Sequence, residues 1–314
     1  MPEWLAEHGI GESRYARILG GEIVEARILL DGVARAGARC TARLVSVRPL
    51  AIAEADGQEF LLPKGAKGIS EGQELVIQVT REAIPGTESW KRPLAVVANE
   101  TEEAPPPPDA EALPFPSPSD SLGQAGWPDL LEEARSGIVR FDGGELRISP
   151  TPAMTLIDVD GYLPPLDLAL AGAEAAARAI LRLDIGGSIG IDLPTVAGKA
   201  ERQSIASAID SILPQPFERT AVNGFGFVQL VRPRLRASLV ELAQDRPSFE
   251  ARALLRRAAT EAPGAKRLVG NPTLIALIEQ KPEWIDALSR QIGGTVTLRS
   301  DASLPIHGGY AEKV

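Results

Sequence analysis

The sequence predicts an α+β protein, with a β-rich N-terminal region that contains an OB-type barrel and an α/β domain with a mixed sheet. Short apolar runs recur about every ten residues up to residue 80, a spacing typical of small barrels and sandwiches. Later, two apolar runs that each end in aspartate flank a helix-forming segment, the pattern of a βαβ unit. A proline-rich acidic stretch lies between the two regions. We therefore expect domains at 1–100 and 128–314, joined by a linker at 101–127.

The N-terminal region reads as a series of β-strands. Two runs joined by Gly20-Gly21 predict a hairpin, because glycine tolerates the left-handed backbone of a tight turn. We expect the later runs to close into an OB-type barrel. The predicted strands lie at 14–19, 22–30, 41–47, 50–55, 59–63 and 74–80.

Residues 101–127 have a different character. Glu102-Glu-Ala-Pro-Pro-Pro-Pro-Asp109 and Leu113-Pro-Phe-Pro-Ser-Pro-Ser-Asp120 contain few apolar side chains. Such composition cannot bury enough surface to fold alone, so we expect a semi-rigid linker or a disordered loop. The alternative is a proline motif that binds a partner.

The C-terminal region alternates predicted helices and strands. Asp142-Gly-Gly predicts a hairpin turn between two short strands. Gly186 follows an alanine-rich periodic segment and predicts the end of a helix there. Helices are expected at 129–136, 168–183, 198–213, 238–259 and 271–291, and strands at 137–141, 145–148, 225–231 and 295–299. Arg252, Arg256 and Arg257 are expected on an exposed face of the helix at 238–259.

The composition argues against several kinds of site. The chain of 314 residues has one cysteine, Cys40, and two histidines, His8 and His307. These numbers exclude an internal disulfide and a Cys-x-x-Cys zinc site, and they disfavour a Ser-His-Asp triad. Any catalysis is expected to use carboxylates, lysine, arginine or a bound metal. The net charge of −9 disfavours indiscriminate binding to nucleic acid but is compatible with a local basic groove.

The sequence also bears on location. The first eight residues lack a basic region followed by an apolar one, which is the pattern of a signal peptide. The most hydrophobic segment, 166–183, carries four charged side chains and is too polar to span a bilayer. We therefore expect a cytoplasmic protein that does not associate with a membrane.

Asp158 and Asp192 are the candidate catalytic residues. A right-handed crossover puts the ends of both strands on the same edge of the sheet, with the carboxylates about 5 Å apart. Two carboxylates that close repel each other, and a Mg²⁺ ion relieves the repulsion. Asp160 lies on the same side of its strand by period-two alternation, which makes it a candidate third metal ligand. The alternative is that each aspartate caps the turn after its strand.

Two further groups are candidates for binding RNA. Arg232 and Arg234 alternate with Pro233, so an extended backbone points both side chains the same way, toward phosphates. The alternative is that they pair with nearby acids. Phe60 and Lys91, together with Trp90, could stack on and clamp a single strand. The alternative for these residues is a place in the core or at the rim of the barrel.

Five segments taken together resemble the bacterial ribonuclease E/G family over nearly the whole chain. Their order and spacing make the similarity more specific than any single segment does. The segments are Arg17-Ile-Leu-Gly-Gly-Glu-Ile-Val-Glu-Ala26, Asp142-Gly-Gly-Glu-Leu-Arg-Ile148, Pro152-Ala-Met-Thr-Leu-Ile-Asp-Val-Asp160, Leu183-Asp-Ile-Gly-Gly-Ser-Ile-Gly-Ile-Asp192 and Asn223-Gly-Phe-Gly-Phe-Val-Gln-Leu-Val-Arg-Pro-Arg-Leu235.

The resemblance implies an endoribonuclease specific for single-stranded RNA. Asp158 and Asp192 would hold one Mg²⁺, and the barrel would grip the RNA. The chain departs from the family in several places. It has Asp160 where asparagine is usual, Gly224 where arginine is expected, and Glu54 where an RNA-facing aromatic is expected. The segment that reads an RNA 5′ end is short. The cysteines that join subunits through zinc are missing, so a homo-oligomer would form without a zinc link.

Three functions are therefore open. The first is a compact, Mg²⁺-dependent endoribonuclease acting in RNA processing or decay. The second is a non-catalytic RNA-binding or assembly protein that keeps the fold. The third is a phosphohydrolase that uses the same carboxylates on small phosphates. Retention of both aspartates favours the first function, and the missing basic and aromatic residues favour the second.

Overall fold

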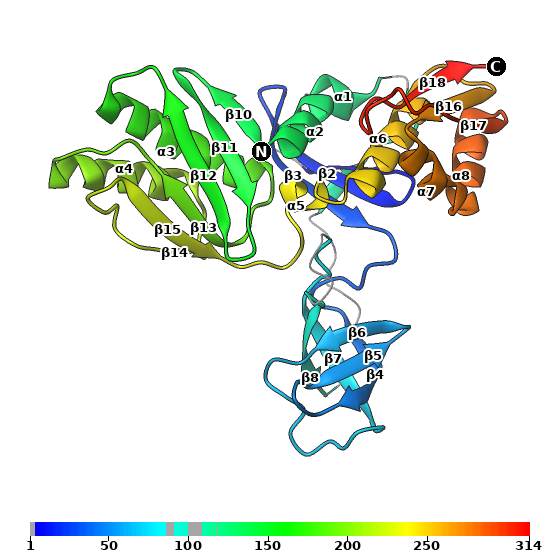
Figure 1. Cartoon of the computed structure of the whole chain (residues 1–314), viewed down its shortest axis with the longest axis horizontal. Coiled ribbons are helices and arrows are strands. Elements are labelled where there is room, and N and C mark those ends of the chain that lie inside the picture. The colour runs from blue at the N-terminus through cyan, green and yellow to red at the C-terminus, as the bar shows by residue number, and fades with distance from the viewer. Residues whose placement is uncertain (1–3, 86–90, 100–108, 118) are drawn as a thin grey trace. The chain divides into compact units, whose positions relative to one another are not determined.

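The computed structural model describes residues 4–85, 91–99, 109–117 and 119–314 and shows an α+β structure with mixed sheets, as predicted (Figure 1). The chain forms two compact units, each built from segments far apart in sequence. Unit 1 comprises Met1–Asp31, Asp109–Arg135 and Leu242–Val314, and unit 2 comprises Gly32–Pro108 and Ser136–Glu241.

These units differ from the division expected at 1–100, 101–127 and 128–314, because the first 31 residues belong with the C-terminal third. Residues 101–108 and 118 of the expected linker lie outside the described part. The rest of that segment contains strand β9 (Ala110–Ala112) and helix α1 (Ser121–Gln124). Strand β9 pairs with β1 (Trp4–His8), so backbone hydrogen bonds order this stretch despite its few apolar side chains.

The first sheet of unit 1 has the strand order β3-β2-β1-β9. Strands β2 (Glu12–Leu19) and β3 (Glu22–Leu30) form the predicted antiparallel hairpin. Gly20 and Gly21 at its turn have φ angles of 63° and 87°, values that side chains other than glycine rarely adopt.

The C-terminal part of unit 1 packs helices against a three-stranded sheet of order β17-β16-β18. The helix expected at 271–291 is two helices, because Pro282 cannot continue the first and begins the second. The helical region at 238–259 is likewise divided, and strands β16 and β18 had no prediction. The C-terminal elements are α6 (Arg246–Thr260), β16 (Lys266–Gly270), α7 (Pro272–Glu279), α8 (Pro282–Ile292), β17 (Val296–Ser300) and β18 (Tyr310–Lys313). Helix α2 (Trp127–Ser136) belongs to the middle segment of unit 1, and α5 (Leu239–Leu242) lies at the boundary with unit 2.

A buried network of ion pairs joins the three segments of unit 1. The Arg252 guanidinium donates to Glu12 (Nε to Oε2, 2.8 Å), and Arg14 donates to the other oxygen of the same carboxylate (2.7 Å). Arg256 donates to both carboxylate oxygens of Glu7, at 2.9 and 3.0 Å. The sequence pattern had suggested an exposed helix face for Arg252 and Arg256, and this is wrong, since both are buried against these acids.

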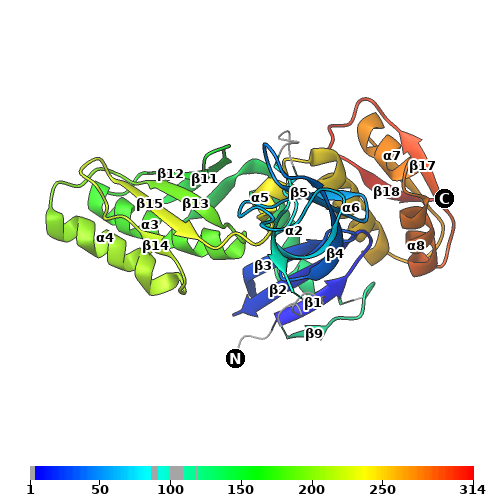
Figure 2. The ribbon, with the colours of Figure 1, turned by 90° about the horizontal axis from the view of Figure 1, so that it is seen from below.

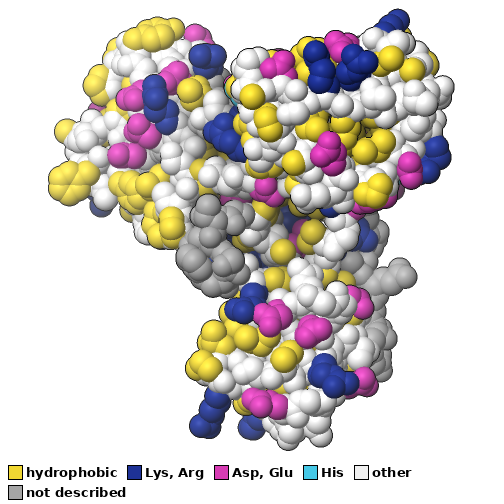
Figure 3. All heavy atoms as spheres, turned by 45° about the vertical axis from the view of Figure 1, so that its right-hand side comes forward, with side chains coloured by type: hydrophobic (Ala, Val, Ile, Leu, Met, Phe, Trp, Pro, Cys, Tyr) yellow, Lys and Arg dark blue, Asp and Glu magenta, His cyan; other side chains and the backbone are white. Residues whose placement is uncertain are grey.

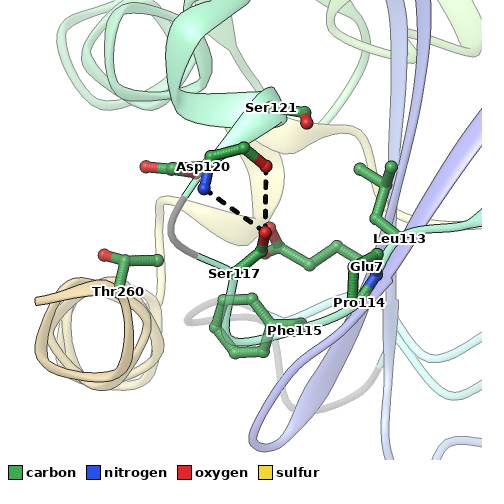
Figure 4. A pocket seen from close by; sticks show the side chains of 9 residues that line it. Glu7, Leu113, Pro114, Phe115, Ser117, Asp120, Ser121 and Thr260 are labelled. Carbon is green, nitrogen blue, oxygen red and sulfur yellow. Dashed lines mark hydrogen bonds between the residues drawn. The ribbon is translucent and has the colours of Figure 1, made fainter. Parts of the chain in front are cut away.

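Burial by itself raises the pKa of Glu12, but the charges of Arg14 and Arg252 outweigh it and hold this pKa below its usual value. Asp120 is a second acidic partner of Arg256. Glu7 and Asp120 both line a small cavity beside Ser117 (Figure 4). The Asp120 N–H donates to the carbonyl of Ser117 at 3.1 Å. The network therefore keeps Glu12 ionised inside the unit.

Replacing Arg256 by methionine is expected to lower the free energy of unfolding by about 3–5 kcal/mol, because Glu7 would lose a bidentate partner while buried. The neighbouring Arg257 is exposed, so Arg257→Met is a matched control with an expected change within about 0.5 kcal/mol. Urea denaturation followed by circular dichroism measures both. Equal losses in the two variants would show that the network contributes little to stability.

Unit 2 contains a closed five-stranded barrel with the order β4-β5-β6-β8-β7. Four of its strands match predicted runs, and β8 had no prediction. Strands β6 and β8 pair in parallel, whereas the other pairs are antiparallel. Leu44, Phe60 and Ile77 fill its core. The strands are β4 (Arg39–Ser46), β5 (Ile52–Ala55), β6 (Gln58–Leu61), β7 (Glu74–Arg81) and β8 (Leu94–Ala98).

Unit 2 also contains a six-stranded mixed sheet of order β10-β11-β12-β13-β15-β14. Helices α3 (Pro165–Arg182) and α4 (Lys199–Ile212) pack side by side along it (Figure 2). The strands are β10 (Ile138–Phe141), β11 (Gly144–Pro150), β12 (Thr155–Gly161), β13 (Gly187–Asp192), β14 (Glu218–Arg219) and β15 (Phe227–Arg232).

Within the described ranges, no helix combines the length and the apolar character needed to cross a bilayer.

Candidate active site

The predicted βαβ unit is confirmed as β12-α3-β13, with the two strands parallel and adjacent. Alanines on α3 allow the helix to lie close to the sheet. Gly172 is the tightest point, because a Cβ there would lie 2.3 Å from Cγ1 of Val159. At the other end, Asp184 and Gly187 adopt positive φ angles and turn the chain back into β13. The packing of α3 therefore fixes the two strands relative to each other.

Burial alternates along β12. Ile157 and Val159 are buried, whereas Leu156, Asp158 and Asp160 are exposed. The aspartates therefore lie on the face of the sheet opposite the buried side chains. We call this exposed side the open face. The sequence argument placed Asp158 at the end of its strand, but β12 continues for three residues beyond it.

The pairing register sets Asp158 directly opposite Asp192, the last residue of β13. The two carboxylates thus project from adjacent strands about 4.8 Å apart. The same row extends to Arg147 on β11, which is paired with Asp158, and to Phe227 on β15, which is paired with Asp192. The structure therefore brings the two predicted catalytic residues together, between a cation and an aromatic ring.

The charges of the site disfavour a fully ionised state. The pKa of Asp158 is raised by partial burial first, and then by the negative charges of Asp160 and Asp192. Arg147 acts in the opposite direction and lowers it, but does not cancel the increase. Asp158 therefore resists ionisation more than a free aspartate does.

Asp160 does not complete a three-carboxylate cluster. It lies two residues beyond Asp158, about 7 Å along the strand, and its Oδ2 is 4.0 Å from Nε of Arg147. In the part of the chain that the structure describes, no group of three or more His, Cys, Asp and Glu side chains is placed to hold a metal ion. Alternation correctly predicted that Asp160 lies on the same face of the sheet as Asp158. The rise of about 3.4 Å per residue along β12 nevertheless separates Asp160 from the pair formed by Asp158 and Asp192.

Arg232 and Arg234 share one side of their segment, as the alternation predicted, but both contact this chain. Arg232 donates to the carbonyl of Ile185 (3.2 Å), and Arg234 forms an ion pair with Glu241. Arg236 donates to Asp184 at 3.1 Å. These contacts match the alternative interpretation, in which the arginines pair with nearby groups, because this side of the segment faces the protein.

Phe60 and Lys91, the barrel residues predicted to bind RNA, both contact the protein itself. Phe60 is 1% exposed in the barrel core, because its position in the alternation of β6 points inward. It cannot stack on a base in this conformation. The Lys91 ammonium donates to the carbonyl of Pro152 (3.3 Å), and Trp90 lies outside the described residues.

Arg147, Phe225 and Phe227 adjoin the aspartates but were not among the predicted site residues. Their signal was present in the register: counting outward from the turn at 151–154, where Pro150 pairs with Thr155, sets Arg147 opposite Asp158. The side chain of Phe225 is 83% exposed at the turn that precedes β15, beyond the end of β13. The predicted strand at 225–231 included Phe225, whereas β15 begins at Phe227. The sequence pattern did not indicate that the ring before the strand is exposed.

No known family model and no curated protein matches the chain.

Asp158→Asn is expected to stabilise the protein at pH 7 by about 0.2–1 kcal/mol, the range for facing side-chain pairs. The folded-state pKa of Asp158 is raised, so the wild type loses stability as the pH rises through that pKa, and the variant does not. The difference should disappear below about pH 4, where the unfolded carboxyl is also protonated. Urea denaturation from pH 3.5 to 8 measures it, with the distant Glu174→Gln as control. A destabilised variant at pH 7 would contradict the repulsion.

Proposed function

We propose that the protein is a metal-dependent endoribonuclease of the ribonuclease E/G type that hydrolyses phosphodiester bonds in single-stranded RNA. The observation that carries the proposal is the register of β12 and β13, which sets Asp158 opposite Asp192 on the open face. Two of the five sequence segments that resemble that family form these two strands.

The donor set fits Mg²⁺. This ion is usually bound by one or two carboxylates, completed by water and substrate phosphates. Asp158 and Asp192 would hold it. The pKa of Asp158 is raised by burial first and then by the charges of Asp160 and Asp192, and a divalent cation would relieve that second effect. A bound Mg²⁺ supplies a Lewis acid for a phosphoryl oxygen and lowers the pKa of a bound water. The chain itself orients the two carboxylates through the packing of α3 and the strand register.

The open face suits a polymer better than a small molecule. Arg147, Asp158, Asp160 and Asp192 are all exposed on it, so a chain of nucleotides can cross the strands without entering an enclosed pocket. Small-molecule sites are usually concave and bury most of their ligand. This difference favours RNA over a small phosphate ester.

We further propose that the barrel is of the OB type and contacts the RNA. Its closed five-stranded order, with β6 parallel to β8, supports this assignment. Hydrophobic and basic side chains appear together on the barrel surface in the lower part of Figure 3. Its exposed large hydrophobic residues are Val45, Val47, Leu50 and Val97.

The second candidate is a non-catalytic RNA-binding or assembly protein of the same fold. The observations that favour it are the separation of Asp160 from the carboxylate pair and the pairing of Arg232 and Arg234 within the chain. Both reduce the groups that reach a substrate. A cleavage assay separates the two candidates directly.

The wild type is expected to cut a 5′-monophosphorylated single-stranded RNA in the presence of Mg²⁺. Asp158→Asn and Asp192→Asn should each lower the rate by roughly 100-fold or more, because each removes a carboxylate from the site that would hold the metal. Glu174→Gln on α3, which also removes one negative charge, should cut at the wild-type rate. Gel analysis of end-labelled RNA gives the rates.

Each alternative outcome has its own meaning. Equal cutting by all variants would indicate a contaminating nuclease and would remove the catalytic assignment. RNA that is bound but not cut by the wild type would support the second candidate. Hydrolysis of a small phosphate ester without cleavage of RNA would indicate a phosphohydrolase.

A measurement independent of activity tests the metal site. Mg²⁺ at ten times its dissociation constant should add about 1.4 kcal/mol to the stability of the wild type, seen as a higher midpoint of thermal unfolding. Asp192→Asn should show little of this increase, and Glu174→Gln should show all of it. An equal response in Asp192→Asn would place the bound Mg²⁺ elsewhere.

A further inference from the structure

The open face carries a row of four side chains that crosses four adjacent strands. The pairing register aligns Arg147, Asp158, Asp192 and Phe227 on β11, β12, β13 and β15. Neighbouring strands are about 4.8 Å apart, so the row spans about 14 Å. It has a guanidinium at one end, an aromatic ring at the other, and the two carboxylates between them.

Arg147 is suited to hold a phosphate. Its side chain is 57% exposed on the open face, next to Asp158 in the row. One amino group donates to Glu145 (Nη2 to Oε1, 2.6 Å), which orients the guanidinium, and Nε is 4.0 Å from Asp160. A guanidinium has five N–H donors in a planar fork that matches the oxygens of a phosphate. One contact to Glu145 therefore leaves a charged edge of suitable shape.

The other end of the row is built to present an aromatic ring. Gly190 lies beside Phe227, and a Cβ on that glycine would lie 2.6 Å from Cζ of the ring. The ring thus occupies the space that a side chain at position 190 would take, on the face that carries Asp192. Phe227 is only half-buried in this position.

The turn before β15 reinforces this end. The side-chain oxygen of Asn223 accepts hydrogen bonds from the N–H groups of Phe225 (2.8 Å) and Phe227 (3.1 Å). Thr195 donates its hydroxyl to the carbonyl of Phe225 at 3.0 Å. Gly226, with φ of 91°, packs so tightly that a Cβ would lie 2.1 Å from the carbonyl oxygen of Leu193. These contacts fix the backbone of the turn and hold Phe225 beside Thr195, three residues beyond Asp192.

We propose that this row is the path of the substrate strand: Arg147 binds a phosphate on one side of the carboxylate pair, and Phe227 with Phe225 stacks a base on the other. The proposal rests on the proposed function, because the carboxylate pair between them is the cleavage site. A stacked base adds affinity with little dependence on sequence, which suits an enzyme of single-stranded RNA. The row would supply the RNA contacts that were predicted for Phe60, Arg232 and Arg234, whose side chains contact the protein itself.

A simpler interpretation must be separated from this one. Arg147 could serve only as a counter-ion to the surrounding acids, and Phe227 only as packing for the sheet. Arg140 is the matched control for charge, because it is exposed on the same face and paired with Glu145, one strand away from the row. Val231 is the matched control for the aromatic end, because it lies on the same strand and face and is 50% exposed.

The first test measures binding of a fluorescein-labelled single-stranded RNA to the full chain carrying Asp192→Asn, which prevents cutting during the measurement. Adding Arg147→Ala should weaken binding about tenfold, as expected for the loss of a charged hydrogen bond. It should also reduce the slope of log affinity against log salt by about 0.7, the value for one phosphate contact on a single strand. Arg140→Ala should leave the slope nearly unchanged. Equal effects of the two arginine variants would overturn the phosphate assignment.

The second test uses the same RNA with 2-aminopurine at successive positions, because stacking on an aromatic ring quenches its fluorescence. Quenching at one position should be lost in Phe227→Leu and in Phe225→Ala and kept in Val231→Ala, with folding checked by circular dichroism. Unchanged quenching in both phenylalanine variants would overturn the stacking assignment. A negative result in either test would contradict the substrate path but would not affect the cleavage assay of Asp158→Asn and Asp192→Asn. The proposed function itself is tested by that cleavage assay alone.

Discussion

Repulsion between the facing carboxylates of Asp158 and Asp192 is the constraint around which unit 2 is arranged. The register of β12 and β13 keeps the two residues facing each other on adjacent strands. That register is held in turn by α3, whose approach to the sheet depends on Gly172. Helix packing on the buried face thus sustains an unfavourable charge arrangement on the open face, as is common where chemistry needs ionisable groups in unusual environments.

In unit 1, by contrast, the buried acids are paired with arginines. Glu7 and Glu12 are buried more deeply than the aspartates of the sheet, yet each is matched by arginines that satisfy its oxygens. Arg147 only partly offsets the acids around it, and the pKa of Asp158 stays raised. Uncompensated negative charge is therefore concentrated where a cation and a phosphate would both be accommodated. Buried acids are paired with arginines in one unit, and in the proposed function the exposed acids of the other unit would hold a cation.

Local patterns predicted the local structure well. The Gly20-Gly21 hairpin and the βαβ unit follow from turn chemistry and apolar runs, and the facing aspartates follow from them. Side-chain direction was harder. Alternation correctly put Arg232 and Arg234 on one side, but which side faces the protein depends on contacts with Ile185 and Glu241 that are distant in sequence. Phe60 and Arg256 failed for the same reason, since neither periodicity nor composition identifies the partner across a core.

The discontinuity of unit 1 has a consequence for synthesis of the chain. Glu7 emerges from the ribosome early, but its partner Arg256 follows 249 residues later. Both segments of unit 2 are complete before α6 exists, so unit 2 can fold during translation while the N-terminal strands still lack Arg252 and Arg256. Such distant pairing slows folding, because a long loop must close before its contacts form. Until then Arg14 is the partner from their own strands that balances Glu7 and Glu12, and the N-terminal strands wait for the end of the chain to complete their unit.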